Sequence, residues 1–231
     1  MPKLYDLAGA EEDRRFSPYC WRIKMALAHK GIEPETVPWR FTDKEAIEFS
    51  GQTRVPVLVD GENVVSDSWR IANYLEDRFS DRPSLFGGPG GRGAARFIAS
   101  WADTVLQPAI ARLIVADIHA HLHERDRKYF RATREKALGG SLEEICADRD
   151  DRVVKFRETD LRPLRATLTE QPYLGGESPT YADYSVFGGF QWARAVSVFR
   201  LLADGDPIAE WRHRMLELHG RLAGKAPGYA V

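Results

Sequence analysis

The sequence predicts a small α/β domain followed by an all-helical domain, on three observations. Patterns typical of strands and of helices alternate over residues 1–80. The segment 81–93 then contains two prolines and five glycines, which is typical of a linker. From 94 to 231 the apolar periodicity is that of helices. We therefore predict domains at 1–80 and 94–231, joined by a linker at 81–93.

The composition limits the classes of partner. The chain has 231 residues with 33 Lys and Arg against 34 Asp and Glu, a formal net charge of −1. This balance gives no global attraction to nucleic acid or to anionic membranes. No apolar run approaches the ~20 residues that span a bilayer, and the start lacks a signal-peptide pattern. With only two distant cysteines as well, we expect a cytoplasmic protein without nucleic-acid or membrane partners.

The first domain should open with a strand and a capped helix. Residues 3–8 alternate between apolar and polar side chains, as a half-buried strand does. Ser17 suits a helix N-cap and Pro18 the first helical position, so we predict a helix from there through Lys30. Gly31 then suits the left-handed residue that follows a helix end.

The rest of this domain should add a hairpin and a second helix. Apolar runs predict strands at 35–39, 55–59 and 63–65, the first at a sheet edge because it contains a proline. The Asp60-Gly61 dipeptide predicts a hairpin between the last two strands. A helix with one apolar face then follows up to Phe79.

The second domain should consist of helices alone. Residues 94–123 form a long apolar-rich segment, and a charged stretch covers 124–136, in which the mixed charges of 124–128 predict a solvated face. Another helical stretch covers 141–168. The spacing of Thr180 and Asp183 predicts a capping box at the start of a mostly apolar helix, which we place at the centre of this domain.

Three short motifs carry the chemistry. Ser17-Pro18-Tyr19-Cys20 resembles the Cys-Pro-Tyr-Cys active site of glutaredoxins, with serine in place of the first cysteine. Together with Val55-Pro56 and Asp67-Ser68 at matching distances, it resembles the thioredoxin-like half of glutathione transferases. The resemblance implies a thioredoxin-like domain plus an all-α domain, with glutathione as co-substrate and a homodimeric assembly.

Ser17 is the candidate catalytic residue. A helix start presents unpaired N–H groups and partial positive charge, and a hydroxyl there can donate a hydrogen bond to a thiolate. Lowering a thiol pKa by about two units requires about 2.7 kcal/mol, which one charge-assisted hydrogen bond and the helix dipole can supply. The alternatives are that Ser17 is only a cap, or that Tyr5 at the end of the first strand has this role, as in other transferase classes.

The resemblance also implies the residues that hold glutathione. A cis-proline at Pro56 would let the backbone of Val55 pair with the cysteinyl part. Ser68 and the adjacent helix N–H groups would hold the γ-glutamyl carboxylate, with Asp67 on its ammonium. Looser candidates for the glycyl carboxylate are Trp39, Arg40 and Lys44.

The resemblance narrows to the bacterial β-aryl etherase branch, which is related to fungal serine-type transferases and cleaves aryl ethers of lignin-derived α-keto compounds with glutathione. It rests on short motifs along nearly the whole chain. These are Leu4-Tyr5-Asp6-Leu7, Ser17-Pro18-Tyr19, Trp21-Arg22, Arg54-Val55-Pro56-Val57, Leu58-Val59-Asp60, Asp67-Ser68-Trp69, Asp81-Arg82-Pro83, Leu138-Gly139-Gly140, Leu142-Glu143-Glu144, Leu174-Gly175-Gly176 and Ala182-Asp183-Tyr184-Ser185.

A small, hydrophobic and aromatic electrophile is the expected second substrate. Its pocket should lie between the domains. Large apolar clefts with few polar groups suit such molecules. The candidate lining residues, each also open to an interpretation as plain core, are Tyr19, Trp21, Trp101, Val105, Ile114, Tyr184, Phe187 and Gln191.

Two other functions remain open from the sequence. One is a glutathione-dependent thiol-disulfide oxidoreductase or deglutathionylase, although Ser17 leaves that chemistry without its protein thiolate and makes Cys20 a small buried apolar residue. The other is a non-catalytic binding protein of the same fold. His119, His121 and His123 form a small cluster without a convincing further ligand, so we expect no metal.

Overall fold

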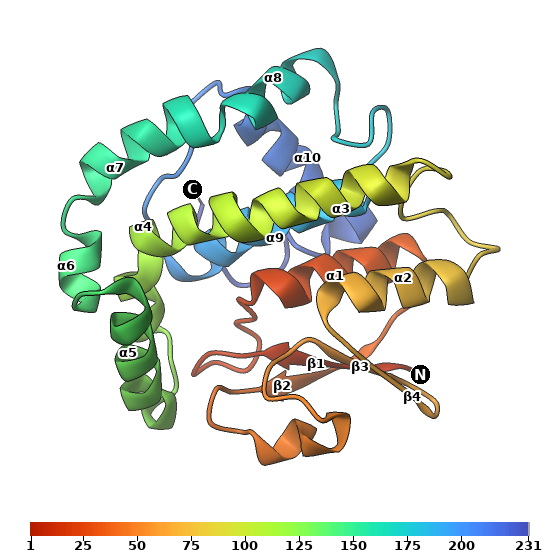
Figure 1. Cartoon of the computed structure of the whole chain (residues 1–231), viewed down its shortest axis with the longest axis horizontal. Coiled ribbons are helices and arrows are strands. Elements are labelled where there is room, and N and C mark those ends of the chain that lie inside the picture. The colour runs from red at the N-terminus through yellow and green to blue at the C-terminus, as the bar shows by residue number, and fades with distance from the viewer. Residues whose placement is uncertain (231) are drawn as a thin grey trace.

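The computed structural model describes residues 1–230 and has a sheet domain followed by a helical domain (Figure 1). The sheet domain contains β1 (Lys3–Leu7), α1 (Pro18–His29), β2 (Glu35–Trp39), a 3₁₀ turn (Glu45–Ser50), β3 (Val57–Asp60), β4 (Asn63–Ser66) and α2 (Ser68–Arg78). The helical domain contains α3 (Gly91–Trp101), a π-helical stretch (Ala102–Leu106), α4 (Gln107–Ala120), α5 (Glu124–Leu138), α6 (Leu142–Cys146), α7 (Arg149–Lys155), a second π-helical stretch (Phe156–Asp160), α8 (Arg162–Glu170), α9 (Tyr181–Val196) and α10 (Pro207–Arg221).

The four strands form one mixed sheet in the order β2-β1-β3-β4. β1 runs parallel to β2, and its Leu4 lies opposite Thr36 there and opposite Leu58 of the antiparallel β3. The predicted hairpin joins β3 to β4, and the proline-containing β2 is at an edge, as expected. Helices α1 and α2 cover one face of the sheet (Figure 1), so the predicted thioredoxin-like domain is confirmed.

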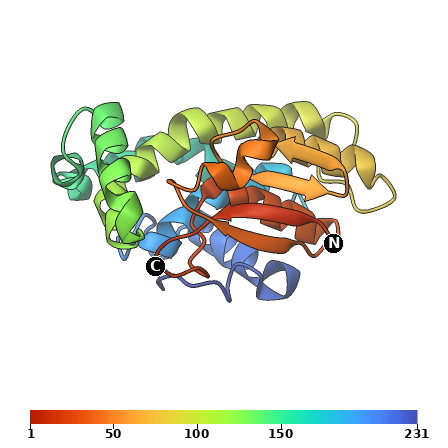
Figure 2. The same cartoon turned by 90° about the horizontal axis from the view of Figure 1, so that it is seen from below.

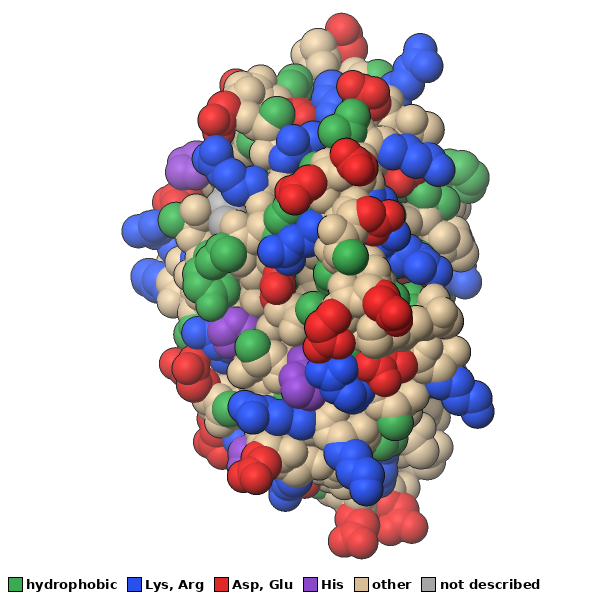
Figure 3. Space-filling view, turned by 90° about the vertical axis from the view of Figure 1, so that its left-hand side faces the viewer, with side chains coloured by type: hydrophobic (Ala, Val, Ile, Leu, Met, Phe, Trp, Pro, Cys, Tyr) green, Lys and Arg blue, Asp and Glu red, His purple; other side chains and the backbone are tan. Residues whose placement is uncertain are grey.

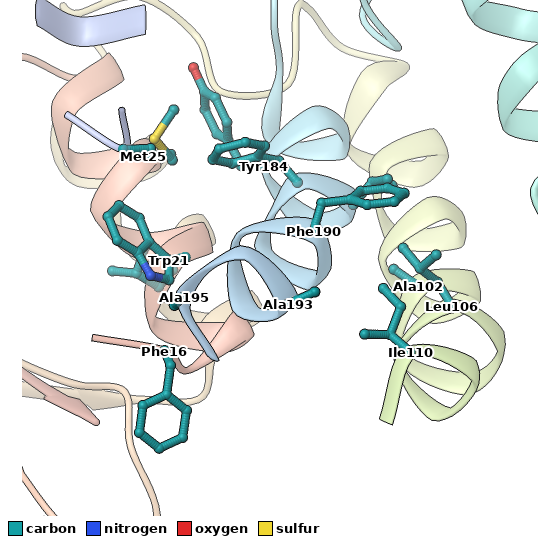
Figure 4. Close-up of a cluster of buried hydrophobic side chains, with 14 of the residues drawn as sticks. Phe16, Trp21, Met25, Ala102, Leu106, Ile110, Tyr184, Phe190, Ala193 and Ala195 are labelled. Atoms are coloured by element: carbon teal, nitrogen blue, oxygen red, sulfur yellow. The ribbon is translucent and has the colours of Figure 1, made fainter. Parts of the chain in front are cut away.

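Helix α9 is the buried central helix of the helical domain, as its apolar sequence predicts. Fourteen of its sixteen residues are buried. Trp21 of α1 packs on one side of α9 and Leu106 and Ile110 pack on the other (Figure 4). At Gly188, α9 and α1 are so close that a Cβ atom on this residue would lie 2.3 Å from the carbonyl oxygen of Pro18. Glycine is therefore required here, and it sets the position of the start of α1.

The start of α9 is the predicted capping box. Oδ2 of Asp183 accepts hydrogen bonds from the backbone N–H groups of Thr180 (2.9 Å) and Gly175 (3.1 Å). Its Oδ1 accepts from the N–H of Leu174 (2.7 Å) and from Nε1 of Trp211 (3.0 Å). The carboxylate thus joins the helix start to the preceding turn and to α10.

The segment between the domains is tightly packed in the structure. Leu85 and Phe86 are buried, and the N–H of Tyr181 donates to the carbonyl oxygen of Leu85 (2.7 Å). Helix α3 already begins at Gly91, inside the predicted linker 81–93. The glycines and prolines therefore predicted a loop here, and the buried side chains of Leu85 and Phe86 hold that loop in place.

The charged stretch after residue 123 forms α5, and one of its charges is not solvated. Asp126 is fully buried and accepts hydrogen bonds from the N–H of Phe41 (3.1 Å), and from the N–H (3.0 Å) and hydroxyl (2.6 Å) of Thr42. Arg125 adds an ion pair with Asp43 at 2.7 Å. The prediction of a solvated face is wrong for this residue, because α5 holds the loop that follows β2.

The outer surface follows the charge balance of the sequence. On the face at the α5–α7 end, basic and acidic side chains are interspersed with small apolar groups (Figure 3). Within residues 1–230, no helix combines the length and apolar character needed to cross a membrane.

Candidate active site

A cavity of about 380 Å³ lies where the sheet domain meets the helical domain, and we call it the Ser17 cavity. It is bordered by the start of α1, the connections around β2 and β3, the π-helical stretch Ala102–Leu106, α4, α5 and α9. Figure 2 shows the arrangement of these elements from below. Its lining residues are Leu7, Phe16, Ser17, Pro18, Tyr19, Trp39, Phe41, Lys44, Arg54, Val55, Asp103, Gln107, Pro108, Ala111, Ile118, Tyr129, Phe130, Arg134 and Trp192. Two larger hollows, of about 470 and 720 Å³, lie beside His219 and do not include Ser17.

Ser17 caps the helix that opens into this cavity. Its backbone is extended, and its Oγ accepts a hydrogen bond from the N–H of Cys20 at 3.2 Å. Because the hydroxyl is the acceptor in that bond, its own proton is available to a ligand. The side chain is 4% exposed, so an anion next to it would be largely removed from water. The cap and the thiolate-binding role are therefore compatible in one residue.

The two competitors of Ser17 lie away from the cavity. Cys20 is fully buried, and burial, followed by the nearby charge of Asp6, raises the pKa of its thiol well above its usual value. The ring of Tyr5 packs against Phe49, with 5.5 Å between the ring centroids. Neither side chain lines the Ser17 cavity.

Several of the residues predicted to hold glutathione line this cavity. The Val55–Pro56 peptide bond is cis, and Val55 lines the cavity together with Ser17. Lys44 also lines it; its Nζ donates to the carbonyl oxygen of Thr53 (2.7 Å) and lies over the ring of Trp39. Trp39 donates its indole N–H to the carbonyl oxygen of Asp43 at 2.6 Å.

Arg40 is directed elsewhere. Its Nε donates to the carbonyl oxygen of Gly9 (3.2 Å), and its guanidinium lies 3.7 Å from the carboxylate of Glu12. It holds the loop between β1 and α1 and does not line the cavity. Lys44 is therefore the better-placed of the two cations.

Asp67 and Ser68 form the start of α2. Oδ1 of Asp67 accepts from the N–H groups of Trp69 and Arg70, both at 3.0 Å, while Ser68 is almost fully buried. Asp67 has φ = 73°, a left-handed conformation that is uncommon and costly for a residue other than glycine. Burial, followed by the charge of Asp103, raises the pKa of Tyr19, which lines the cavity. Asp67 and Ser68 themselves are not among the residues that line the Ser17 cavity.

The candidate acceptor residues do not gather around one pocket. Tyr19 lines the cavity, but Trp21 is buried and donates its indole N–H to the carbonyl oxygen of Arg15. Gln191 donates to the carbonyl oxygen of Ala223. The remaining candidates do not line the cavity. Ile114, Tyr184 and Phe187 lie in the core, Trp101 packs partly buried against it, and Val105 is exposed. The aromatic residues Phe41, in the loop after β2, and Tyr129 and Phe130, on α5, line the Ser17 cavity instead.

Comparison with known proteins decides the family. Residues 16–78 match the model of the N-terminal domain of glutathione S-transferases, and residues 94–217 match that of the C-terminal domain. The chain belongs to the glutathione S-transferase family.

Individual relatives are distant but cover most of the chain. The sequence is 26% identical over 208 residues to glutathione S-transferase U28 of Arabidopsis thaliana, covering 87% of this chain and 81% of that protein. The crystal structure of a glutathione transferase of Phanerochaete chrysosporium, GSTFuA3, matches with a TM-score of 0.75 and 27% identity over 96% of this chain and 93% of that one. A glutathione S-transferase of Ceriporiopsis subvermispora, CsGST63524, solved in complex with glutathione, shares the fold with a TM-score of 0.84, 23% identity, and coverage of 95% and 96%.

The histidine cluster of this transferase has structural contacts. Nε2 of His121 is 3.1 Å from the hydroxyl of Tyr229, and Nδ1 of His123 accepts from the N–H of Arg125 at the start of α5. His119 lies in the last turn of α4. Among residues 1–230, no group of three or more potential ligands has the geometry to hold a metal ion.

Arg54, Tyr129, Phe130 and Arg134 are among the polar and aromatic residues of the cavity to which the sequence motifs assigned no role. Arg54 directly precedes Val55, and that adjacency was a usable signal. Tyr129, Phe130 and Arg134 lie on α5, where a mixed-charge sequence conceals them. Their position depends on how α5 packs against the loop after β2, which no local pattern specifies.

Proposed function

We propose that this transferase joins the sulfur of glutathione to a hydrophobic, aromatic electrophile in the Ser17 cavity. The observation that carries the proposal is the hydroxyl of Ser17 at an open helix start, with a free proton and almost no solvent exposure. A thiolate placed there receives a charge-assisted hydrogen bond and the positive end of the helix dipole. No protein thiol competes for the role, since Cys20 is buried and its pKa is raised.

The rest of glutathione would be held by groups of both charges. The N–H groups at the start of α2 and the hydroxyl of Ser68 suit the γ-glutamyl carboxylate, and Asp67 suits its ammonium. The backbone of Val55 suits the cysteinyl part. Lys44 suits the glycyl carboxylate, and we add Arg54, an exposed cation beside Val55 on the cavity wall.

The proposed reaction is a displacement by the thiolate. The thiol proton passes to solvent as the thiolate forms beside Ser17. The new carbon–sulfur bond forms as the bond to the leaving group breaks, and the leaving group departs with the electron pair. In a β-aryl ether the leaving group is a phenolate, which is the reaction of the etherase branch that the sequence resembles. The aromatic side of the cavity, with Phe41, Tyr129 and Phe130, supports an aromatic acceptor.

We also propose that two copies associate, as the family resemblance implies. Phe97 on α3 is 75% exposed and is compatible with such a contact. A second copy covering this helix would bury it.

Calorimetric titration with glutathione tests the proposal first. We expect saturable binding that the Lys44→Met variant weakens, and no binding at millimolar glutathione would overturn the proposal. A panel of aryl ethers, halonitrobenzenes, hydroperoxides and disulfides then tests the reaction. We expect turnover of the first two classes; exclusive turnover of disulfides would favour an oxidoreductase.

A further inference from the structure

Arg134 places a positive charge in the acceptor part of the Ser17 cavity. It lies in the second half of α5 and lines the cavity together with Ser17. Its guanidinium carbon is 5.4 Å from the ring centroid of Phe41 and 4.9 Å from that of Phe130. The cation is thus fixed among the aromatic rings where the acceptor is proposed to bind.

This cation has no carboxylate partner. Within residues 1–230, no acidic oxygen lies within 4.0 Å of the Arg134 guanidinium, and its one hydrogen bond goes to the hydroxyl of Thr133 at 3.2 Å. Burial, followed by the positive charge of Arg54, lowers its pKa, although the group remains a cation at neutral pH. Arg131, one turn earlier on the same helix, instead forms ion pairs with both Glu135 and Glu143.

The cavity wall does not supply the missing negative charge. Of the described residues that line it, Asp103 is the one carboxylate, and its Oδ1 already accepts from Nη2 of Arg22 at 2.6 Å and from Nε2 of Gln107 at 3.3 Å. Arg134 is half-buried, and removing a cation even partly from water without a partner is unfavourable. A bound anion would offset that cost, and bidentate pairing makes arginine well suited to a carboxylate.

We propose that the acceptor substrate is an aromatic electrophile that carries a carboxylate, which Arg134 binds while the ring packs against Phe41 and Phe130. The proposal rests on the proposed function, in which Lys44 and Arg54 take the glycyl carboxylate and the start of α2 takes the γ-glutamyl carboxylate. Arg134 is then the cation of the cavity that glutathione leaves without an anion. It acts as a specificity residue for the second substrate.

Two stable conjugates separate this proposal from the glutathione site itself. S-(4-carboxybenzyl)glutathione and S-(4-carbamoylbenzyl)glutathione share the peptide and the ring and differ in the anionic group. In calorimetric titration we expect the carboxylate to bind the wild-type protein about 10- to 100-fold more tightly than the amide, as a charge-assisted hydrogen bond predicts. Arg134→Met should remove that preference and leave the affinity for the amide within about threefold.

The controls address charge and folding. Lys136→Met removes an exposed cation from the same helix and should keep the preference. Arg134→Lys keeps the charge but loses the bidentate fork, so it should keep part of the preference for the carboxylate conjugate. If Arg134→Met does not fold, Arg134→Lys takes its place in the test. Equal affinity of the wild-type protein for both conjugates, or an equal loss of both in Arg134→Met, would overturn the proposal. If neither conjugate nor glutathione binds, the proposed function itself fails.

Discussion

Helices α1 and α9 pack against each other, and each begins with a hydroxyl residue, but their starts are completed in different ways. At α9 the carboxylate of Asp183 accepts five hydrogen bonds: two from the turn before the helix, two from the N–H and hydroxyl of Thr180, and one from Trp211. At α1 the hydroxyl of Ser17 accepts one bond, and the helix start lines a cavity. At α9 the polar groups of the helix start are satisfied by the chain itself, whereas at α1 the hydroxyl proton of Ser17 remains available to a ligand.

This difference shows how a cap can be recognised as functional. A capping residue in a local sequence has the same geometry whether it stabilises the helix or binds an anion. What separates the two is the space beside the cap and the number of partners that the fold provides. Substitutions at the two helix starts should therefore affect different measurements: stability at α9 and ligand chemistry at α1.

The largest effect should come from Asp183→Ala. The change leaves five donors around a buried site without that acceptor, and each unsatisfied buried group costs about 1–3 kcal/mol before relaxation. We expect a loss of about 4 kcal/mol in the free energy of unfolding, measured by urea denaturation. Asp183→Asn should lose less, because the amide keeps an acceptor oxygen and burial raises the pKa of the native carboxyl. A loss below about 1 kcal/mol would show that this helix start is not a structural anchor.

Ser17→Ala should act on the ligand more than on the fold. We expect the pKa of the thiol of bound glutathione to rise by about two units, which corresponds to about 2.7 kcal/mol. Thiolate absorbance of the complex as a function of pH measures the shift. The matched control is Thr180→Ala, which removes the hydroxyl from the other helix start and should lower stability by about 1 kcal/mol without moving the thiol titration. An unchanged titration curve in Ser17→Ala would move the role to the backbone N–H groups of α1.

The contact between the two helices should also matter, at Gly188. A Cβ there would lie 2.3 Å from the carbonyl oxygen of Pro18, so Gly188→Ala must push the start of α1 away from α9. We expect about 2 kcal/mol of destabilisation from overpacking and weaker glutathione binding by calorimetry. At the neighbouring Gly189 the nearest atom would be Cδ1 of Ile110, at 3.2 Å, and a flexible side chain can yield. If Gly189→Ala is as harmful as Gly188→Ala, the close approach of the helices does not position the site.

The parts of the molecule that sequence predicted well are those with local signals. Ser17-Pro18, Asp60-Gly61 and the pair Thr180 and Asp183 each specify a cap or a turn through neighbours a few residues away. The structure places a turn or a helix start at each of them. The family resemblance added the cis bond at Pro56, which composition and spacing do not encode.

The acceptor side could not be predicted in the same way, for two physical reasons. Apolar residues at helical spacing, such as Tyr184 and Phe187, have the same pattern in a packed core as in a pocket, and the structure buries both in the core. Conversely, α5 has the composition of a solvated helix. Its Asp126 and Arg134 become important only because tertiary packing brings α5 against the loop at Phe41 and Thr42.

The smallest predicted effect concerns the far end of α1, where, as at the start of α9, polar side chains of the chain itself bind one another. The hydroxyl of Tyr184 lies 2.7 Å from Nδ1 of His29 and 3.2 Å from Nε2 of His219. Burial, followed by the nearby charge of His29, lowers the pKa of His219 to about 4. The unfolded chain, with a pKa near 6.5, therefore binds more protons between these values, so this stabilising effect is complete above pH 6.5 and is lost as the pH falls toward 4.

We expect His219→Gln to reduce the fall in the melting temperature between pH 7.5 and pH 5. Because His219 is partly exposed, the difference should be on the order of 1 kcal/mol, or about 3 °C for a chain of this size. Thermal unfolding of both proteins at the two pH values measures it. His213→Gln, which removes an exposed histidine of the same helix, should retain the wild-type slope. If the melting temperature falls equally between the two pH values in the wild-type and His219→Gln proteins, a neutral His219 does not stabilise the far end of α1.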